Sequence, residues 1–125
     1  MARDIIRTGD APSSPIFSQA VRAGGLIFVS GQAPIDPATG TISGETIQEQ
    51  TRQSLTNVRT ILEAAGSGLD KIVSATVILV EESDFAGMNE EWARWFPADP
   101  PARQGAKLPI RGGGIKVSVA VIAGA

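Results

Sequence analysis

The order of apolar and polar residues along the chain predicts a sheet that begins with three strands. Residues 3–9 are typical of a short edge strand, and residues 16–32 form two extended runs separated by a pair of glycines. Glycine allows the positive φ that a tight turn requires, so these runs are predicted to form a hairpin that ends at Gly31. Residues 33–44 are rich in proline and glycine and are predicted to form a loop.

The next segment has the three- and four-residue apolar spacing of an amphipathic helix. Thr46 and Glu49 have the spacing of a capping box, and Gly66 supplies a helix stop. The apolar stripe between them consists of Ile47, Thr51, Leu55, Val58, Leu62 and Ala65. A second helix is predicted to begin with a Ser83 cap and to end before the double proline at residues 100–101. Its apolar stripe consists of Phe85, Met88, Trp92 and Phe96.

Three further strands, at residues 70–82, 102–110 and 115–125, complete the pattern. The chain is therefore predicted to be one α+β domain over residues 1–125, in the order β-β-β-α-β-α-β-β, with two helices on one face of a mixed sheet. Apart from Ser74, residues 73–80 are β-branched or aliphatic on both faces, and no third helix is predicted that could cover the second face. Association of sheets between subunits would cover it, so we predict a homo-oligomer.

Composition narrows the possible chemistry. Eleven basic and thirteen acidic residues give a net charge of −2, which provides no overall positive field for nucleic acid or an anionic membrane. The chain has no cysteine, histidine or tyrosine. Disulfides, Ser-His-Asp triads, thiolate nucleophiles and His/Cys zinc sites are thereby excluded within one chain. No apolar run reaches the roughly 18 residues of a membrane span, and we expect a cytoplasmic protein.

Arg103, in the stretch PPARQGAKLP at residues 100–109, is the first candidate for a ligand contact. The ordinary role of a lone arginine is an ion pair with an acidic side chain. Arg103, however, follows a rigid corner at the start of a predicted interior strand. Its neighbours Ala102 and Gly105 are small enough to let a ligand approach.

Two further stretches carry polar groups of interest. The strand end at residues 29–32, VSGQ, exposes a hydroxyl and backbone N–H groups, although Ser-Gly is also a common way for strands to end. Asn89 follows Met88 at the polar flank of the second helix, where a solvated role is the ordinary one.

The chain resembles the RidA family, also known as the YjgF or L-PSP family, over essentially its whole length. The resemblance is carried by residues FVSGQAPIDPATG (28–40), QTRQSLTNVRTILEAAGSGLDKIVSATVIL (50–79), DFAGMNEEWARWF (84–96), PPARQ (100–104) and IKVSVAVIA (115–123). It implies a chorismate-mutase-like subunit and a homotrimer with three ligand clefts between subunits.

The resemblance also implies a reaction, the hydrolysis of small 2-iminoacids of the 2-aminoacrylate type to 2-ketoacids and ammonia, with no metal and no cofactor. Arg103 matches the family arginine that grips the substrate carboxylate. Ser30, Gly31 and Asn89 match residues that line the cleft, and Gln104 is the neighbour of the arginine within its motif.

Three positions depart from the family pattern. Phe17 stands where deaminating members have a tyrosine, Gly105 where many have a cysteine, and Ser118 where they have a glutamate that handles water. A serine can hold a water but is a poor proton relay at neutral pH. An alternative function is therefore a non-catalytic trimer that binds small carboxylates. Ribonuclease or translation inhibition, which the family name suggests, is not supported by the negative net charge.

Overall fold

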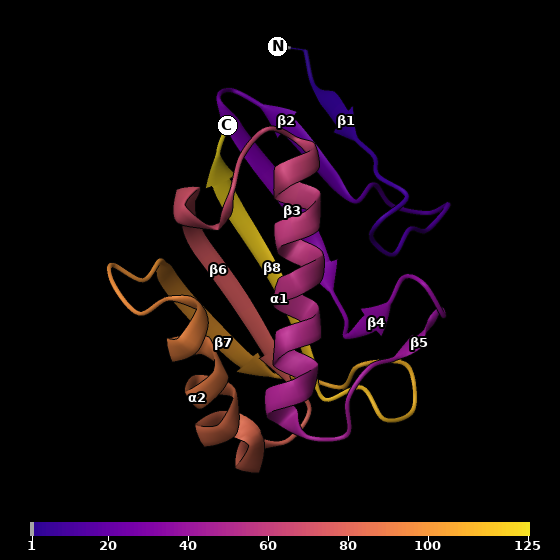
Figure 1. The fold of residues 1–125 in the computed structure, drawn as a ribbon, viewed down its shortest axis with the longest axis vertical. Coiled ribbons are helices and arrows are strands. Elements are labelled where there is room, and N and C mark those ends of the chain that lie inside the picture. The colour runs from indigo at the N-terminus through magenta and orange to yellow at the C-terminus, as the bar shows by residue number, and fades with distance from the viewer. Residues whose placement is uncertain (1) are drawn as a thin grey trace.

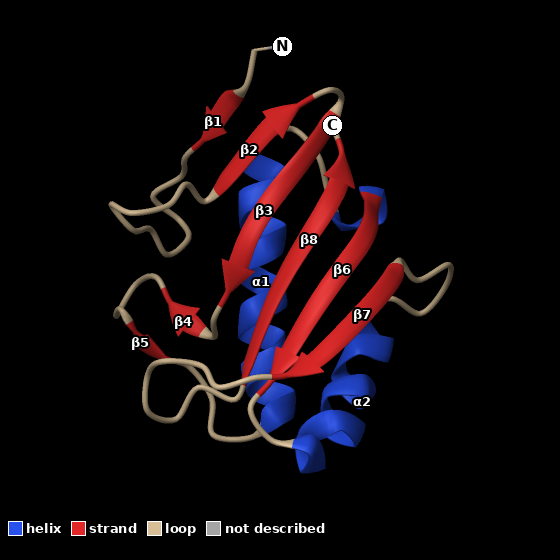
Figure 2. Ribbon diagram, turned by 180° about the vertical axis from the view of Figure 1, so that it is seen from behind, coloured by secondary structure: helices blue, strands red, loops and turns tan. Residues whose placement is uncertain are grey.

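The computed structural model describes residues 2–125 and shows a sheet with both helices on one side (Figure 1, Figure 2). This confirms the predicted α+β class with a mixed sheet. The sheet strands are β1 (Asp4–Ile6), β2 (Ala20–Ala23), β3 (Leu26–Gln32), β6 (Ile72–Leu79), β7 (Ala102–Lys107) and β8 (Val117–Gly124). A separate hairpin contains β4 (Ile35–Asp36) and β5 (Thr41–Ile42), and the helices are α1 (Ile47–Ala64) and α2 (Phe85–Trp95).

The order of strands in the sheet is β1-β2-β3-β8-β6-β7. All neighbours are antiparallel except β6 and β7, which run parallel because α2 forms the crossover between them. The strand that carries Arg103 is therefore the edge of the sheet, and all six of its residues are exposed in the single chain. The prediction of an interior strand was wrong for one subunit, because β7 finds a partner on one side only.

The helices pack against one face of the sheet and leave the other face uncovered. On the helix face, Leu55, Val58 and Leu62 of α1 are fully buried, as are Ile27 and Val119 of the sheet. On the other face, visible in front in Figure 2, no element of residues 2–125 covers the strands. Phe28 there is 43% exposed. The second cover predicted for residues 73–80 is thus not supplied by this chain.

The start and end of α1 follow the predicted signals. The Thr46 hydroxyl accepts a hydrogen bond from the Glu49 N–H at 3.1 Å, and the Glu49 carboxylate accepts one from the Thr46 N–H at 3.1 Å. Gly66 has a φ of 79°, and the N–H of Ser67 donates to the Leu62 carbonyl at 2.9 Å. The capping box and the glycine stop are both confirmed.

Thr46→Ala is expected to lower the free energy of unfolding by about 1 kcal/mol, because it leaves the Glu49 N–H without its side-chain acceptor. Urea denaturation followed by circular dichroism measures the loss. Thr46→Ser keeps the acceptor and is the control. Equal stability of the alanine and serine variants would show that the capping box contributes nothing.

Three local predictions were wrong. Ser83 does not cap α2, which begins at Phe85 after a short 3-10 turn over Glu82–Asp84 and has no side-chain cap. The predicted loop at residues 33–44 contains the β4–β5 hairpin. The strand β3 does not end at Gly31 but continues to Gln32 through an irregularity in its pairing with β8 between Val29 and Gln32. A bulge of this kind redirects side chains at the point where it occurs.

A buried carboxylate ties α2 to α1. Glu91 is 2% exposed and accepts hydrogen bonds from Arg52 Nε at 3.1 Å and Nη2 at 3.2 Å, and from Trp95 Nε1 at 2.9 Å. Burial alone raises the pKa of Glu91, but the bonds from Arg52 and Trp95 lower it more, and the net pKa lies below its ordinary value. Glu91 therefore stays charged and fixes the position of α2.

No helix within residues 2–125 is both long and apolar enough to cross a membrane.

Candidate ligand site

Arg103 points to the helix face of the sheet. It pairs in register with Ala75, which is 1% exposed beneath the helices, whereas Gln104 pairs with Thr76 on the uncovered face and donates to its hydroxyl at 3.1 Å. The Arg103 guanidinium carbon lies 5.1 Å from the Trp92 ring centroid and 5.9 Å from that of Phe85. Its Nη1 donates to Met88 Sδ at 3.6 Å. The apolar stripe of α2 thus packs against the Arg103 side chain.

Arg103 has no ion-pair partner among residues 2–125 of its own chain. Burial against the aromatic rings lowers the pKa of Arg103 from its ordinary value, although more than a third of the residue is exposed. Cation–π contacts hold the guanidinium in place but leave its N–H fork largely unused. The alternative reading of Arg103 as half of a structural ion pair is therefore wrong.

A cavity of about 480 Å³, called the arginine cavity here, opens beside this guanidinium between β7 and the start of α2. Its charged residues are Arg103, Lys107 and Glu82, and the rest of its wall consists of Val77, Leu79, Phe85, Met88, Gln104, Gly105 and Ala106. The cavity combines an apolar wall with convergent charged groups, as small-molecule sites do. Glu82 and Lys107 were not among the predicted site residues.

Asn89 lies at the margin of this region. It is half-buried on α2, one helical turn after Phe85, and it is not one of the residues that line the arginine cavity. Gly105 lines the cavity with its backbone, and a Cβ at this position would lie 3.3 Å from the Val77 carbonyl. The structure therefore brings Arg103, Gln104 and Gly105 together with Asn89 nearby. These four residues are called the arginine group below.

A second set of predicted residues meets at the bulge of β3. A Cβ at Gly31 would lie 2.9 Å from the Ser118 hydroxyl, which shows how closely that side chain approaches the bulge. The Ser30 hydroxyl donates to the Ser18 carbonyl at 2.6 Å, and the Ser30 N–H donates to the Gln19 carbonyl at 3.0 Å. These bonds attach the Phe17 segment to β3. Phe17, Ser30, Gly31 and Ser118 are called the serine group.

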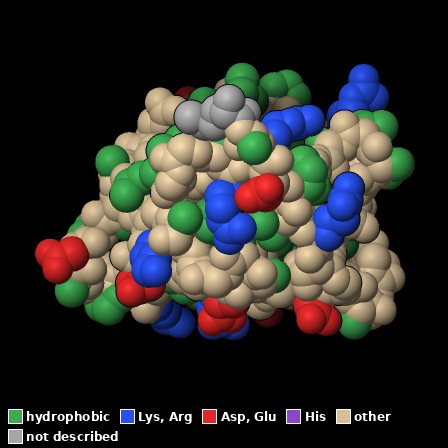
Figure 3. All heavy atoms as spheres, turned by 90° about the horizontal axis from the view of Figure 1, so that it is seen from above, with side chains coloured by type: hydrophobic (Ala, Val, Ile, Leu, Met, Phe, Trp, Pro, Cys, Tyr) green, Lys and Arg blue, Asp and Glu red, His purple; other side chains and the backbone are tan. Residues whose placement is uncertain are grey.

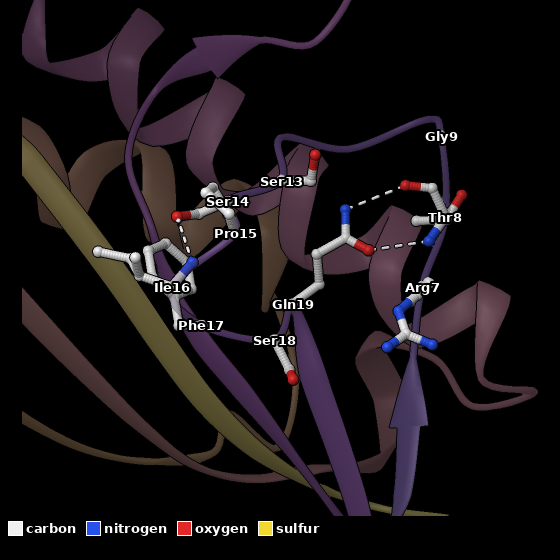
Figure 4. Close-up of a pocket in the computed structure, with 10 residues that line it drawn as sticks. All are labelled: Arg7, Thr8, Gly9, Ser13, Ser14, Pro15, Ile16, Phe17, Ser18 and Gln19. Carbon is white, nitrogen blue, oxygen red and sulfur yellow. Dashed lines mark hydrogen bonds between the residues drawn. The ribbon is translucent and has the colours of Figure 1, made fainter.

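Phe17 is presented by the loop between β1 and β2 (Figure 4). It is 52% exposed, and the adjacent Ile16 is 87% exposed. The loop surrounds a hollow of about 700 Å³ and is organised by Gln19, which is 4% exposed. The Gln19 amide donates to the carbonyls of Thr8 and Ala11 at 3.0 and 3.1 Å, and its oxygen accepts from the Thr8 N–H at 2.8 Å. Sequence reasoning missed Gln19, because nothing in its spacing distinguishes it from a surface glutamine.

The two groups do not meet within one chain. Ser118 pairs with Ile78 on the uncovered face, whereas Arg103 projects toward the helices. The strand β6 lies between β7 and β8, so the backbones of Arg103 and Ser118 are at least about 10 Å apart. A small ligand held by Arg103 therefore cannot contact Ser118 of the same subunit.

Comparison with known proteins places the chain in a family. The family model described as endoribonuclease L-PSP matches residues 8–124. A RutC family protein of Pyrococcus horikoshii is 48% identical over 103 residues, 81% of each chain. The 2-iminobutanoate/2-iminopropanoate deaminase of Capra hircus is 37% identical over 128 residues, which cover 99% of this chain and 93% of the relative.

Solved structures agree with this assignment. A conserved Rid family protein of Yersinia pestis, described as of unknown function, superposes with a TM-score of 0.93 at 36% identity, covering 99% of this chain and 100% of that one. The sequence similarity extends over nearly all of the fold. The chain belongs to the endoribonuclease L-PSP family, to which the RidA and YjgF proteins also belong.

Proposed function

We propose that this protein hydrolyses small 2-iminoacids of the 2-aminoacrylate type to 2-ketoacids and ammonia. The observation that carries the proposal is Arg103: a guanidinium seated on Trp92 and Phe85, facing a cavity, with no ion-pair partner among residues 2–125. Its fork of donors fits a carboxylate with two parallel bonds. A deaminase of this kind from goat, similar to this chain over nearly its full length, supports the same reaction.

Arg103 acts in this proposal by positioning. A carboxylate held at two points fixes the adjacent C=N carbon relative to the cavity wall, and a bound water then attacks that carbon. The apolar residues of the wall accept the substrate side chain. Binding needs neither a metal ion nor a covalent bond to the protein.

The complete site in this proposal lies between subunits of a homotrimer. Arg103 and Ser118 project from opposite faces of one sheet, so a second subunit has to supply the serine group to a ligand on the arginine group. The uncovered sheet face has an apolar surface that such contacts would bury. Phe28, Ala120 and Ile122 line a shallow hollow on it.

Phe28→Glu is expected to convert the trimer to monomers, because a carboxylate at this position would be buried without a partner in the subunit interface. Light scattering after gel filtration measures the mass. Phe28→Leu keeps an apolar side chain and is expected to stay trimeric. A wild-type protein that is monomeric at micromolar concentration would contradict the proposed assembly.

The deaminase proposal is tested by following an unstable imine. An amino-acid oxidase generates 2-iminobutanoate from 2-aminobutanoate, and semicarbazide traps the imine that remains. We expect the protein to accelerate the loss of imine and the release of 2-oxobutanoate. Decay that is unchanged by the protein, for this imine and for those with larger side chains, would refute the proposed reaction.

The second candidate, a non-catalytic binder of small carboxylates, rests on Ser118. This residue of β8 lies next to the bulge of β3 and provides a hydroxyl but no acid. If the protein only binds small carboxylates, 2-ketoacids should raise its melting temperature while no imine is consumed. Ribonuclease activity has less support, because the net charge is −2 and the charges of both signs are interspersed on the face shown in Figure 3.

A further inference from the structure

Glu82 is a carboxylate in the arginine cavity that the reaction described so far does not use. It lies on the short 3-10 turn Glu82–Asp84 that leads into α2. Together with Arg103 and Lys107 it lines the cavity, and it is the one acidic residue among the lining residues that the structure describes there. The 3-10 turn and β7 therefore contribute one negative and two positive groups to the lining of the same cavity.

These charges are separated rather than paired. Within residues 2–125, no ion pair at 4.0 Å or less includes Glu82, Arg103 or Lys107. Glu82 is exposed, and none of the side-chain hydrogen bonds within that range involves it. The cavity of about 480 Å³ thus has an anionic group and cationic groups with room for a small molecule between them. Lys107 and Arg103 are the charged groups that face Glu82 from β7, and α2 contributes only Phe85 and Met88.

This arrangement complements a protonated 2-iminoacid, which carries a carboxylate at one end and a cationic nitrogen at C2. If Arg103 binds the carboxylate, the apolar residues of the wall are available to the substrate side chain, and Glu82 is the one anionic lining residue among residues 2–125 that could attract the cationic nitrogen. Opposite charges attract more strongly in a partly closed cavity than in bulk water.

We propose that Glu82 is the catalytic proton-transfer residue of this site, taking the role that Ser118 cannot fill. The inference rests on the proposed deaminase function and deepens it. A carboxylate is a competent general base at neutral pH, whereas a serine hydroxyl is a poor one.

Glu82 takes a proton from water as the water oxygen bonds to C2 of the protonated imine and the C=N π electrons move to nitrogen. Glu82 returns that proton to the amine nitrogen of the resulting carbinolamine. It then takes the proton of the new hydroxyl as C2=O forms and the C–N bond breaks, and it passes this proton to the departing ammonia. Protonated imine and water become 2-ketoacid and ammonium.

The test compares Glu82→Gln with Glu81→Gln, which removes the neighbouring exposed carboxylate outside the cavity. Turnover of 2-iminobutanoate and calorimetric binding of 2-oxobutanoate are measured for both variants and for Glu82→Asp. We expect Glu82→Gln to lower kcat about 10²-fold, in the range of general acid–base catalysis. Its affinity for 2-oxobutanoate should stay within about threefold of wild type, since Arg103 is intact. Glu81→Gln should match wild type, and Glu82→Asp should recover part of the activity.

The outcomes separate the two proposals. A wild type that consumes imine, with Glu82→Gln retaining kcat within twofold, would refute the role of Glu82 and leave the deaminase proposal standing. A wild type that binds 2-oxobutanoate but consumes no imine would refute both. Equal losses in Glu81→Gln and Glu82→Gln would assign the effect to general surface charge and overturn the specific role of Glu82.

Discussion

Arg103→Ala is expected to lower kcat/KM for 2-iminobutanoate by about 10²-fold and to weaken the binding of 2-oxobutanoate by a similar factor. Removing one partner of a hydrogen-bonded charge pair costs roughly 2–5 kcal/mol, and each 1.4 kcal/mol is a factor of ten. The lower part of that range applies, because Arg103 is more than one-third exposed. Steady-state kinetics and calorimetry measure the two effects.

Two further variants show whether the loss in Arg103→Ala comes from the charge or from the planar guanidinium group. Arg103→Lys keeps the charge but loses the planar fork, so an intermediate loss is expected. Arg111→Ala removes an exposed arginine that does not line the arginine cavity and should leave both measurements unchanged. Equal activity of wild type and Arg103→Ala would show that the carboxylate is held elsewhere.

Glu91→Ala is expected to lower the free energy of unfolding by about 3 kcal/mol. The substitution leaves the Trp95 N–H and the Arg52 guanidinium without the carboxylate that they share. Loss of one partner from a buried pair costs about 3–5 kcal/mol. The lower limit applies because the Arg52 side chain is 50% exposed and can rehydrate. Urea denaturation measures the change.

The adjacent Glu90 supplies the matched control. Its carboxylate lies 3.6 Å from Arg94, and both side chains are more than half exposed. Glu90→Ala should therefore cost less than about 0.5 kcal/mol. If both variants lose the same stability, burial of Glu91 is not the source of the effect.

The contribution of Glu91 should also depend on pH in a defined direction. Because the folded state lowers the pKa of Glu91, its stabilising effect is present above the ordinary glutamate pKa of about 4.3. It is lost as the pH falls through the lower folded value. The stability difference between wild type and Glu91→Gln should hence be constant above about pH 5 and shrink in more acidic solution. This profile uses the same denaturation measurement.

The sequence was sufficient for the parts of the fold that depend on local signals. The capping box at Thr46, the apolar stripe of α1 and the stop at Gly66 all involve residues a few positions apart. Edge position is a different matter. β7 is an edge strand because β6 is its one partner within residues 2–125, while β8 pairs with β6 and β3 instead. The pairing of β6 with β8 joins residues that are roughly 40 to 50 positions apart in the chain. Apolar periodicity carries no information about such partners.

The candidate site, too, could be predicted from the sequence only in part. Arg103 was identified from its motif and from its position after a rigid corner. The packing of Phe85 and Trp92 against Arg103 was not predicted, because the sequence shows these residues only as part of the apolar stripe of the second helix. Glu82 was missed because it was placed at the end of the predicted strand over residues 70–82. In the structure β6 ends at Leu79, Glu82 lies on a 3-10 turn, and the approach of β7 to the start of α2 gives it a cavity.

A crystal structure of the complex with 2-oxobutanoate would show whether Arg103 binds the carboxylate in a site between two subunits. We predict that the ligand carboxylate lies about 2.8 Å from two nitrogens of Arg103, with its keto carbon directed toward Glu82 and toward Ser118 of a neighbouring subunit. A ligand bound away from Arg103, or enclosed by residues of a single subunit, would contradict the account.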